Sequence, residues 1–211
     1  MPEETISKTL FDKYDQEKNY DAIAYLVEML SLQTELSYLY IYFREKHALA
    51  EENILETDIT KQYLDDYSFY LKNCIYRIYD FQNKYALFMN SIIQYVRISP
   101  NSLEKKFPGW FTLLKALENT KLSPYKKVII KTKNNPSLKE ITQNRYLMTH
   151  RKLILPSSTY ISSYVLPLGG EEAKSKGKWI KESKSTLDEA ISALDLLFSE
   201  TIKIILIKAS A

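Results

Sequence analysis

Apolar residues recur at alternating spacings of three and four along two long stretches in the first half of the chain. Such spacing places every member of a stretch on one face of an α-helix. The first stretch contains Ala22, Tyr25, Met29, Leu32, Leu36, Leu39 and Phe43. The second contains Leu64, Tyr67, Leu71, Cys74, Ile78, Phe81, Tyr85, Phe88, Ile92 and Tyr95. The pattern predicts two long helices, with Asp58 capping the second and Pro100 ending it.

The second half of the chain is less regular. Asn135 and Pro136 suit the N-cap and the first turn of a further helix. Residues 153–184 contain prolines, serines and three of the four glycines, which predicts an irregular segment. A last helix is predicted to start at Ser185, because Ser185 and Asp188 match a capping box.

Together these elements predict an all-α fold. It is an antiparallel helix bundle with two long N-terminal helices and an irregular excursion before the last helix. We expect a single domain over residues 1–211, with residues 153–184 as a loop or insertion. The presence of only four glycines disfavours β-rich folds with many tight turns and phosphate-binding glycine loops. The seventeen tyrosines are expected to fill helix interfaces.

Compartment and membrane association are constrained by three features. Cys74 is the only cysteine, so the chain cannot form an internal disulfide or a thiolate metal site. The N-terminal sequence MPEETISKTLF is acidic and lacks the apolar core of a signal peptide. No apolar run reaches the length of a membrane span. We therefore expect a cytoplasmic protein with no membrane partner.

The formal net charge of +3 conceals an uneven distribution. Residues 1–102 contain 10 basic and 16 acidic side chains, a net charge of −6. Residues 103–152 contain 12 basic and 3 acidic side chains, a net charge of +9. Residues 153–211 contain 7 of each and are neutral. The middle block indicates affinity for a polyanion, and a solvated lysine-rich surface is the alternative.

Metal and nucleophile chemistry find little support in the sequence. The two histidines, His47 and His150, are far apart and belong to no metal-binding motif. Asp65 and Asp66 are adjacent on a predicted helix, where neighbours point about 100° apart. We expect no metal ion and no other cofactor. His47 lies in the charged stretch REKHA and is expected at the surface or at the end of the bundle.

The segment NRYLMTHRK, Asn144–Lys152, places Arg145 before His150 with four residues between them. On a helical wheel Arg145 falls in the apolar arc near Ile141, whereas His150 lies roughly 140° away. Either the helix ends before His150, or a site takes residues from more than one chain or segment. A structural role is the alternative, with Arg145 bridging to a glutamate and His150 capping the helix.

An all-helical bundle with R-x4-H near its penultimate helix, followed by a loop and a closing amphipathic helix, resembles the HEPN superfamily. The family signature is R-x4–6-H, which reads RYLMTH here. The resemblance implies a metal-independent endoribonuclease of the defence or toxin type, acting as a homodimer with an antitoxin or regulatory protein as a further partner. A non-catalytic module that binds a partner protein, RNA or a nucleotide stays open, because Tyr146 directly follows the arginine and the excursion is long.

The resemblance also implies roles for individual residues. Arg145 and His150 are the catalytic pair and meet the same pair of a second subunit at the two-fold axis. The pKa of histidine lies near neutrality, which suits His150 as general acid or base. Arg145 binds the phosphate through its planar fork of donors. RNA contact and positioning are assigned to Asn144, Thr149, Arg151 and Lys152.

Overall fold

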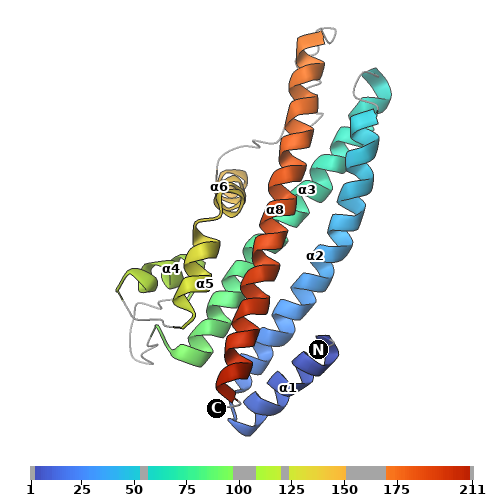
Figure 1. Cartoon of the computed structure of the whole chain (residues 1–211). Coiled ribbons are helices and arrows are strands. Elements are labelled where there is room, and N and C mark those ends of the chain that lie inside the picture. The colour runs from blue at the N-terminus through green and yellow to red at the C-terminus, as the bar shows by residue number, and fades with distance from the viewer. Residues whose placement is uncertain (1–2, 53–56, 97–107, 120–123, 151–169, 210–211) are drawn as a thin grey trace. The chain divides into compact units, whose positions relative to one another are not determined.

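The computed structural model describes residues 3–52, 57–96, 108–119, 124–150 and 170–209 (Figure 1). These residues form helices and no strand, which confirms the all-α bundle. The helices are α1 (Glu3–Gln16), α2 (Tyr20–Glu52), α3 (Thr57–Ile93), α4 (Trp110–Asn119), α5 (Lys126–Lys133), α6 (Pro136–His150) and α8 (Gly170–Ala209). The two long helices predicted from the apolar stripes are α2 and α3.

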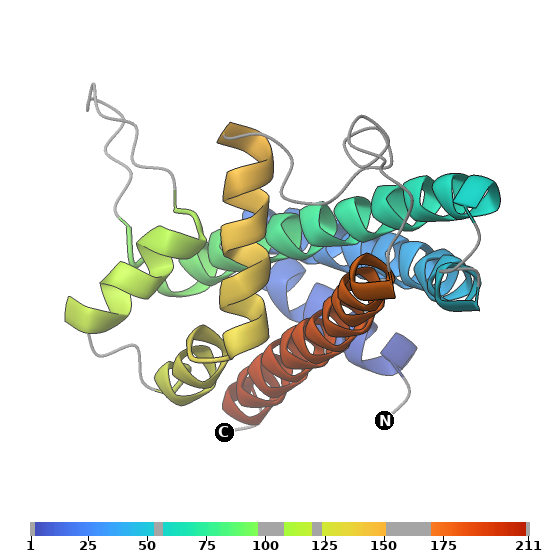
Figure 2. The same ribbon diagram turned by 90° about the horizontal axis from the view of Figure 1, so that it is seen from above.

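The chain divides into two compact units, and α2, α3 and α8 each contribute one stretch to both. Unit 1 comprises Met1–Gln33, Asp80–Asn134 and Leu194–Ala211. Unit 2 comprises Thr34–Tyr79 and Asn135–Ala193. Within each unit the α2 and α3 segments lie side by side and run antiparallel (Figures 1 and 2). The expectation of a single domain stays a prediction.

The core of unit 1 is built from aromatic residues that meet edge to face. Tyr14 of α1 contacts Phe88 of α3, with ring centres 6.0 Å apart. Phe81 of α3 contacts Phe198 of α8 in the same geometry at 5.9 Å. Such pairs contribute beyond the burial of their area. Tyr14 therefore lies at a helix interface, as expected of the tyrosines, whereas three tyrosines of α2 are exposed.

Helix α3 ends earlier than Pro100, so that prediction is wrong. Its last residue is Ile93, and Gln94 adopts a left-handed conformation with φ of 47°. The Gln94 N–H donates to the Asn90 carbonyl over 2.9 Å, and the Val96 N–H donates to Asn90 Oδ1 over 2.8 Å. These bonds satisfy groups left open where the helix stops.

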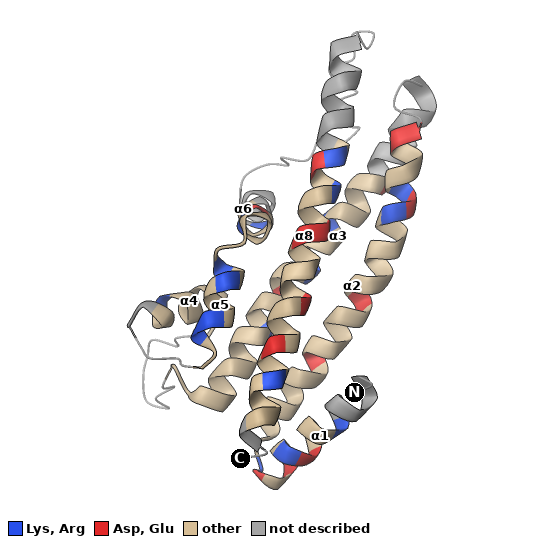
Figure 3. Ribbon diagram, viewed as in Figure 1, with Lys and Arg blue, Asp and Glu red and all other residues tan. Residues whose placement is uncertain are grey.

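Helix α5 in unit 1 is short and basic. Its eight residues, KKVIIKTK, include four lysines and no acidic residue. Ile129 and Thr132 are buried and fix the side of the helix that faces the core. Figure 3 shows basic and no acidic positions along α5. The basic block of the sequence therefore includes a helix with a well-defined lysine side.

The core of unit 2 lies between α2, α3 and α8. Helix α6 packs against this core with one buried leucine and one buried isoleucine. Tyr67 of α3 is fully buried, and its hydroxyl donates to the Ile180 carbonyl of α8 over 3.3 Å. Phe43 of α2 is also fully buried, and its ring centre lies 5.2 Å from that of Tyr67. The other buried apolar side chains are Leu36, Ala50, Leu71, Cys74, Ile75, Ile78, Leu138, Ile141, Ile180, Leu187 and Ala190.

Helix α8 starts at Gly170, fifteen residues before the predicted start at Ser185, so the predicted excursion over 153–184 is too long. Residues 170–184 are helical, and only 151–169 lie outside the described residues. Ile180 and Leu187 are buried seven residues apart, which is the spacing of one helical face. This repeat continues the apolar stripe upstream and outweighs the glycines, each of which costs about 1 kcal/mol in a helix.

Candidate functional site

Helix α6 carries the Arg145–His150 motif, and its first turn is fixed by a side-chain cap. The Leu138 N–H donates to Asn135 Oδ1 over 2.9 Å, and Pro136 is the first helical residue. This confirms the predicted start of the helix. Leu138 and Ile141 are buried, so the apolar arc of the helical wheel faces the interior of unit 2.

Two polar contacts connect α6 to α8 within unit 2. The buried Ser137 hydroxyl donates to the Glu189 carboxylate over 2.6 Å. The Thr186 hydroxyl lies 3.5 Å from the Glu140 carboxylate. A hydrogen bond to a charged group contributes about 1.5–3 kcal/mol when it is well formed, so the Ser137 contact is the stronger of the two. These contacts limit rotation of α6 and thereby set the direction in which Arg145 leaves the helix.

Arg145 is half-buried and lies against an aromatic ring. Its guanidinium carbon is 4.1 Å from the centre of the Tyr79 ring on α3. A guanidinium over the face of a tyrosine at this distance forms a cation–π contact, which contributes about 0.5–2 kcal/mol depending on desolvation. The position agrees with the helical wheel, which placed Arg145 in the apolar arc. Unit 2 thus holds a cation on the side of α6 that faces α3.

The other members of the predicted site lie beyond what the structure describes. The side chains of Asn144, Thr149 and His150 and the whole of Arg151 and Lys152 are outside the described residues. Their contacts with Arg145, and the pair itself, stay predictions.

The course of α6 nevertheless decides one question. The helix runs to His150, so the alternative in which it ends before that residue is wrong. Five residues of regular helix separate the directions of Arg145 and His150 by roughly 140°. A site that uses both residues therefore takes groups from more than one chain or segment.

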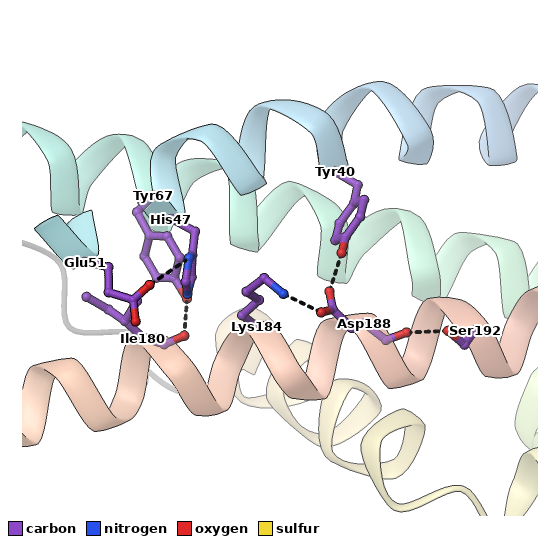
Figure 4. A network of polar contacts seen from close by, with 8 residues as sticks. All are labelled: Tyr40, His47, Glu51, Tyr67, Ile180, Lys184, Asp188 and Ser192. Carbon is purple, nitrogen blue, oxygen red and sulfur yellow. Dashed lines mark hydrogen bonds and ion pairs between the residues drawn. The ribbon is translucent and has the colours of Figure 1, made fainter. Parts of the chain in front are cut away.

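His47 is buried in unit 2, so the expected surface position is wrong, and the residue lies five residues before the end of α2. The residue is 6% exposed, and its ring centre lies 6.2 Å from that of Phe43. The Tyr67 ring centre lies 6.0 Å away (Figure 4). Its Nδ1 lies 3.7 Å from the Glu51 carboxylate, one turn further along α2. The signal in the sequence was the spacing of four from Phe43, which keeps His47 on the buried face despite its charged neighbours.

A second set of polar contacts in unit 2 centres on Asp188 of α8. The Tyr40 hydroxyl donates to one carboxylate oxygen, and Lys184 Nζ donates to the other over 2.6 Å (Figure 4). Asp188 is therefore an interior residue of a helix that contacts α2, and the predicted capping box with Ser185 is wrong. Burial, with the hydrogen bond to Asp188, raises the pKa of Tyr40 to about 12. Tyr40 therefore stays a hydrogen-bond donor near neutral pH and is unsuited to act as a base.

The environment of His47 predicts acid sensitivity of unit 2. Burial is the largest effect on the pKa of His47 and lowers it, with Lys184 acting in the same direction and Glu51 and Asp188 opposing. The fourth neighbour, Tyr67, stays neutral because burial raises its pKa. The unfolded chain therefore binds more protons than the folded chain, and stability falls as the pH drops below about 6.5.

Urea unfolding at pH 7.5 and pH 5.5 tests this expectation. The wild-type protein should lose more stability between the two pH values than a His47→Gln variant. Equal losses in the two proteins would show that His47 does not contribute to the acid sensitivity.

Metal-ligating side chains do not cluster in the part of the chain that the structure describes: no group of three or more His, Cys, Asp or Glu could hold an ion there. Cys74 is fully buried on α3, and burial raises the pKa of its thiol to about 12. The thiol is therefore protonated near neutral pH and fills space as a small apolar side chain, as the stripe predicted.

Among the described helices, none has an apolar stretch long enough to cross a membrane. Comparison of the chain with family models, with curated proteins and with solved structures finds no match. The resemblance in the motif RYLMTH is therefore the source of the functional expectation, and Arg145 is the member of the motif whose contacts are described.

Proposed function

We propose that the protein is a metal-independent endoribonuclease of the HEPN type, acting in the cytoplasm as a homodimer in defence or growth arrest. The observation that carries the proposal is the position of Arg145, half-buried over Tyr79 on the inner side of α6. A cation on the apolar face of a helix is unfavourable unless it has a partner or a role. The Tyr79 ring is a partner of this cation, and binding a phosphate would give the guanidinium a catalytic role as well. His150 lies on the same helix.

The proposed reaction uses the nucleophile that RNA itself carries. The ribose 2′-oxygen attacks the adjacent phosphorus as His150 of one subunit takes the 2′-hydroxyl proton. The bond from phosphorus to the 5′-oxygen breaks, and that oxygen takes a proton from water. Arg145 donates hydrogen bonds to the phosphate and stabilises the charge added in the transition state. The products are a 2′,3′-cyclic phosphate and a 5′-hydroxyl.

A dimer accounts for the angle between the two motif residues. Because Arg145 and His150 leave α6 in directions roughly 140° apart, one helix cannot aim both at a single phosphate. Two helices that meet across a two-fold axis bring an arginine of one copy beside a histidine of the other. In this arrangement Asn144 and Thr149 orient the pair, and Arg151 and Lys152 add affinity for the RNA backbone.

Cleavage of mixed RNA in the presence of a chelator tests the proposal. We expect the protein to cut RNA, to leave the two product ends given above, and to leave DNA intact because DNA lacks the 2′-hydroxyl. RNA that stays whole at high protein concentration, or cleavage that requires an added metal ion, would contradict it.

The contact of Arg145 with Tyr79 also favours a second candidate, a non-catalytic HEPN-like module. In that case the arginine stabilises α6 through the tyrosine ring, and the protein binds RNA, a nucleotide or a partner protein without turnover. Binding of RNA with no new ends in the same chelated assay would favour this candidate over the nuclease.

A further inference from the structure

The solvent side of α5 carries a concentration of positive charge. Lys126, Lys127 and Lys131 are exposed, and Lys133 is half-buried. Among the described residues, no carboxylate forms an ion pair with Lys126, Lys127 or Lys131. We call these four lysines the lysine face.

The arrangement of the lysine face does not serve the stability of the helix. Lys126 and Lys127 stand in the first turn, where the helix dipole disfavours cations. The structure gives α5 no side-chain cap at Tyr125 to offset this charge. Lys127 and Lys131 are four residues apart, a spacing at which like charges repel. An anionic ligand would relieve both effects at once.

By contrast, other lysines of the protein have carboxylate partners. Lys13 pairs with Glu17, and Lys203 pairs with Glu200. Lys84 contacts the Glu28 carboxylate, and Lys181 lies 3.5 Å from that of Glu51. Together these four lysines have the same formal charge as the lysine face, and a carboxylate lies beside each of them. The four paired lysines are Lys13, Lys84, Lys181 and Lys203.

The ligand that fits the lysine face is a chain of phosphates rather than a protein surface. Protein interfaces need an apolar centre, and α5 exposes no large apolar side chain among its described residues. Lys126 and Lys133 are seven residues apart, which corresponds to about 10 Å along the helix axis. A nucleic-acid strand presents several phosphates over that length.

We infer that the lysine face of α5 binds the phosphate backbone of RNA. The choice of RNA among polyanions rests on the proposed function, whereas the binding itself does not require cleavage. Affinity of this kind is electrostatic and independent of base sequence, and it weakens steeply as salt displaces the lysines from the phosphates.

The test compares two fourfold variants that change the net charge equally. One converts Lys126, Lys127, Lys131 and Lys133 to glutamine, which preserves helix propensity. The other makes the same change at the four paired lysines. Fluorescence anisotropy measures binding of a single-stranded RNA of about 25 nucleotides with 2′-O-methyl riboses, which cannot be cleaved through the 2′-oxygen, at several salt concentrations in chelator.

We expect the lysine-face variant to bind this RNA at least about tenfold more weakly than the wild type at 100 mM salt. The slope of the logarithm of the binding constant against the logarithm of the salt concentration should become less steep. The expected change is about 0.7 for each phosphate that the variant no longer neutralises. The paired-lysine variant should stay within about threefold of the wild type. Equal weakening of both variants would show a general effect of net charge and overturn the inference. Wild-type affinity in the lysine-face variant would also overturn the inference. Tighter binding of polyglutamate than of RNA by the wild-type protein would do the same.

The outcomes separate this inference from the nuclease proposal. Binding that depends on the lysine face, with no cleavage of unmodified RNA, removes the nuclease and leaves the binding surface. Cleavage of unmodified RNA with unchanged binding by the lysine-face variant removes the binding surface and leaves the nuclease. Thermal melts of both variants establish that they are folded before binding is compared.

Discussion

Replacing His150 by alanine is expected to slow RNA cleavage by about 100- to 10,000-fold, the range that a general acid or base contributes. Arg145→Ala should cause a loss of about 100- to 1,000-fold, because a positioned donor to the developing charge is removed. The measurement is the initial rate of cleavage of a labelled RNA in chelator. Loss of activity with retained RNA binding would assign both residues to the chemical step.

Two further arginine variants separate chemistry from structure. Arg145→Lys keeps the positive charge but loses the planar fork of donors, so we expect it to stay strongly impaired. Arg77→Ala removes a half-buried arginine of the same unit that pairs with Glu35 over 2.8 Å, and cleavage should be unchanged. If Arg145→Ala lowers the melting temperature but cleaves at the wild-type rate, the contact with Tyr79 is its whole function.

Phe43→Ala is expected to lower the free energy of unfolding by about 3–5 kcal/mol. Phe43 is fully buried in unit 2, with the rings of Tyr40, Tyr67 and His47 centred within 6.2 Å. Truncation to a methyl group removes these neighbours' packing partner and leaves a cavity that rigid helices fill only in part. Urea unfolding followed by circular dichroism measures the change.

The matched control is Phe69→Ala, the same substitution at a residue of unit 2 that is 59% exposed. Because Phe69 is largely in solvent already, its removal should change stability by no more than about 0.5 kcal/mol. Similar losses for the two variants would mean that Phe43 is not in the core of unit 2.

The regular helices were predictable because one signal, the apolar stripe, extends over many turns. The stripes of α2 and α3 contain residues that are buried in the structure, including Met29, Phe43, Tyr67 and Phe88. Their ends were harder, because α3 stops at a left-handed Gln94 and not at a proline. A left-handed residue other than glycine leaves little trace in a sequence.

The errors in the second half and at His47 have a common physical cause. Glycines and charged neighbours are local signals, whereas burial depends on which face a residue shares with distant ones. Ile180 lies seven residues before Leu187 and belongs to the buried face of α8, although Gly177 stands between the helix start and Ile180. His47 follows Phe43 on the buried face of α2 in the same way.

The position of Arg145 could be predicted only in part from the sequence. Its place in the apolar arc followed from the helical period, and the structure puts it against Tyr79. The tyrosine itself could not be identified beforehand, because the packing of α6 against α3 depends on contacts such as that of Ser137 with Glu189. Whether His150 of another copy meets Arg145 depends on an assembly that one chain does not specify.

Mixing two inactive variants tests the shared site most directly. Arg145→Ala and His150→Ala subunits are combined, allowed to exchange, and assayed for RNA cleavage in chelator. A mixed dimer retains one arginine and one histidine, and an arrangement across a two-fold axis predicts that they face each other and that cleavage reappears. A mixture as inactive as its components, after exchange has been demonstrated, would contradict a site built from Arg145 and His150 of two copies.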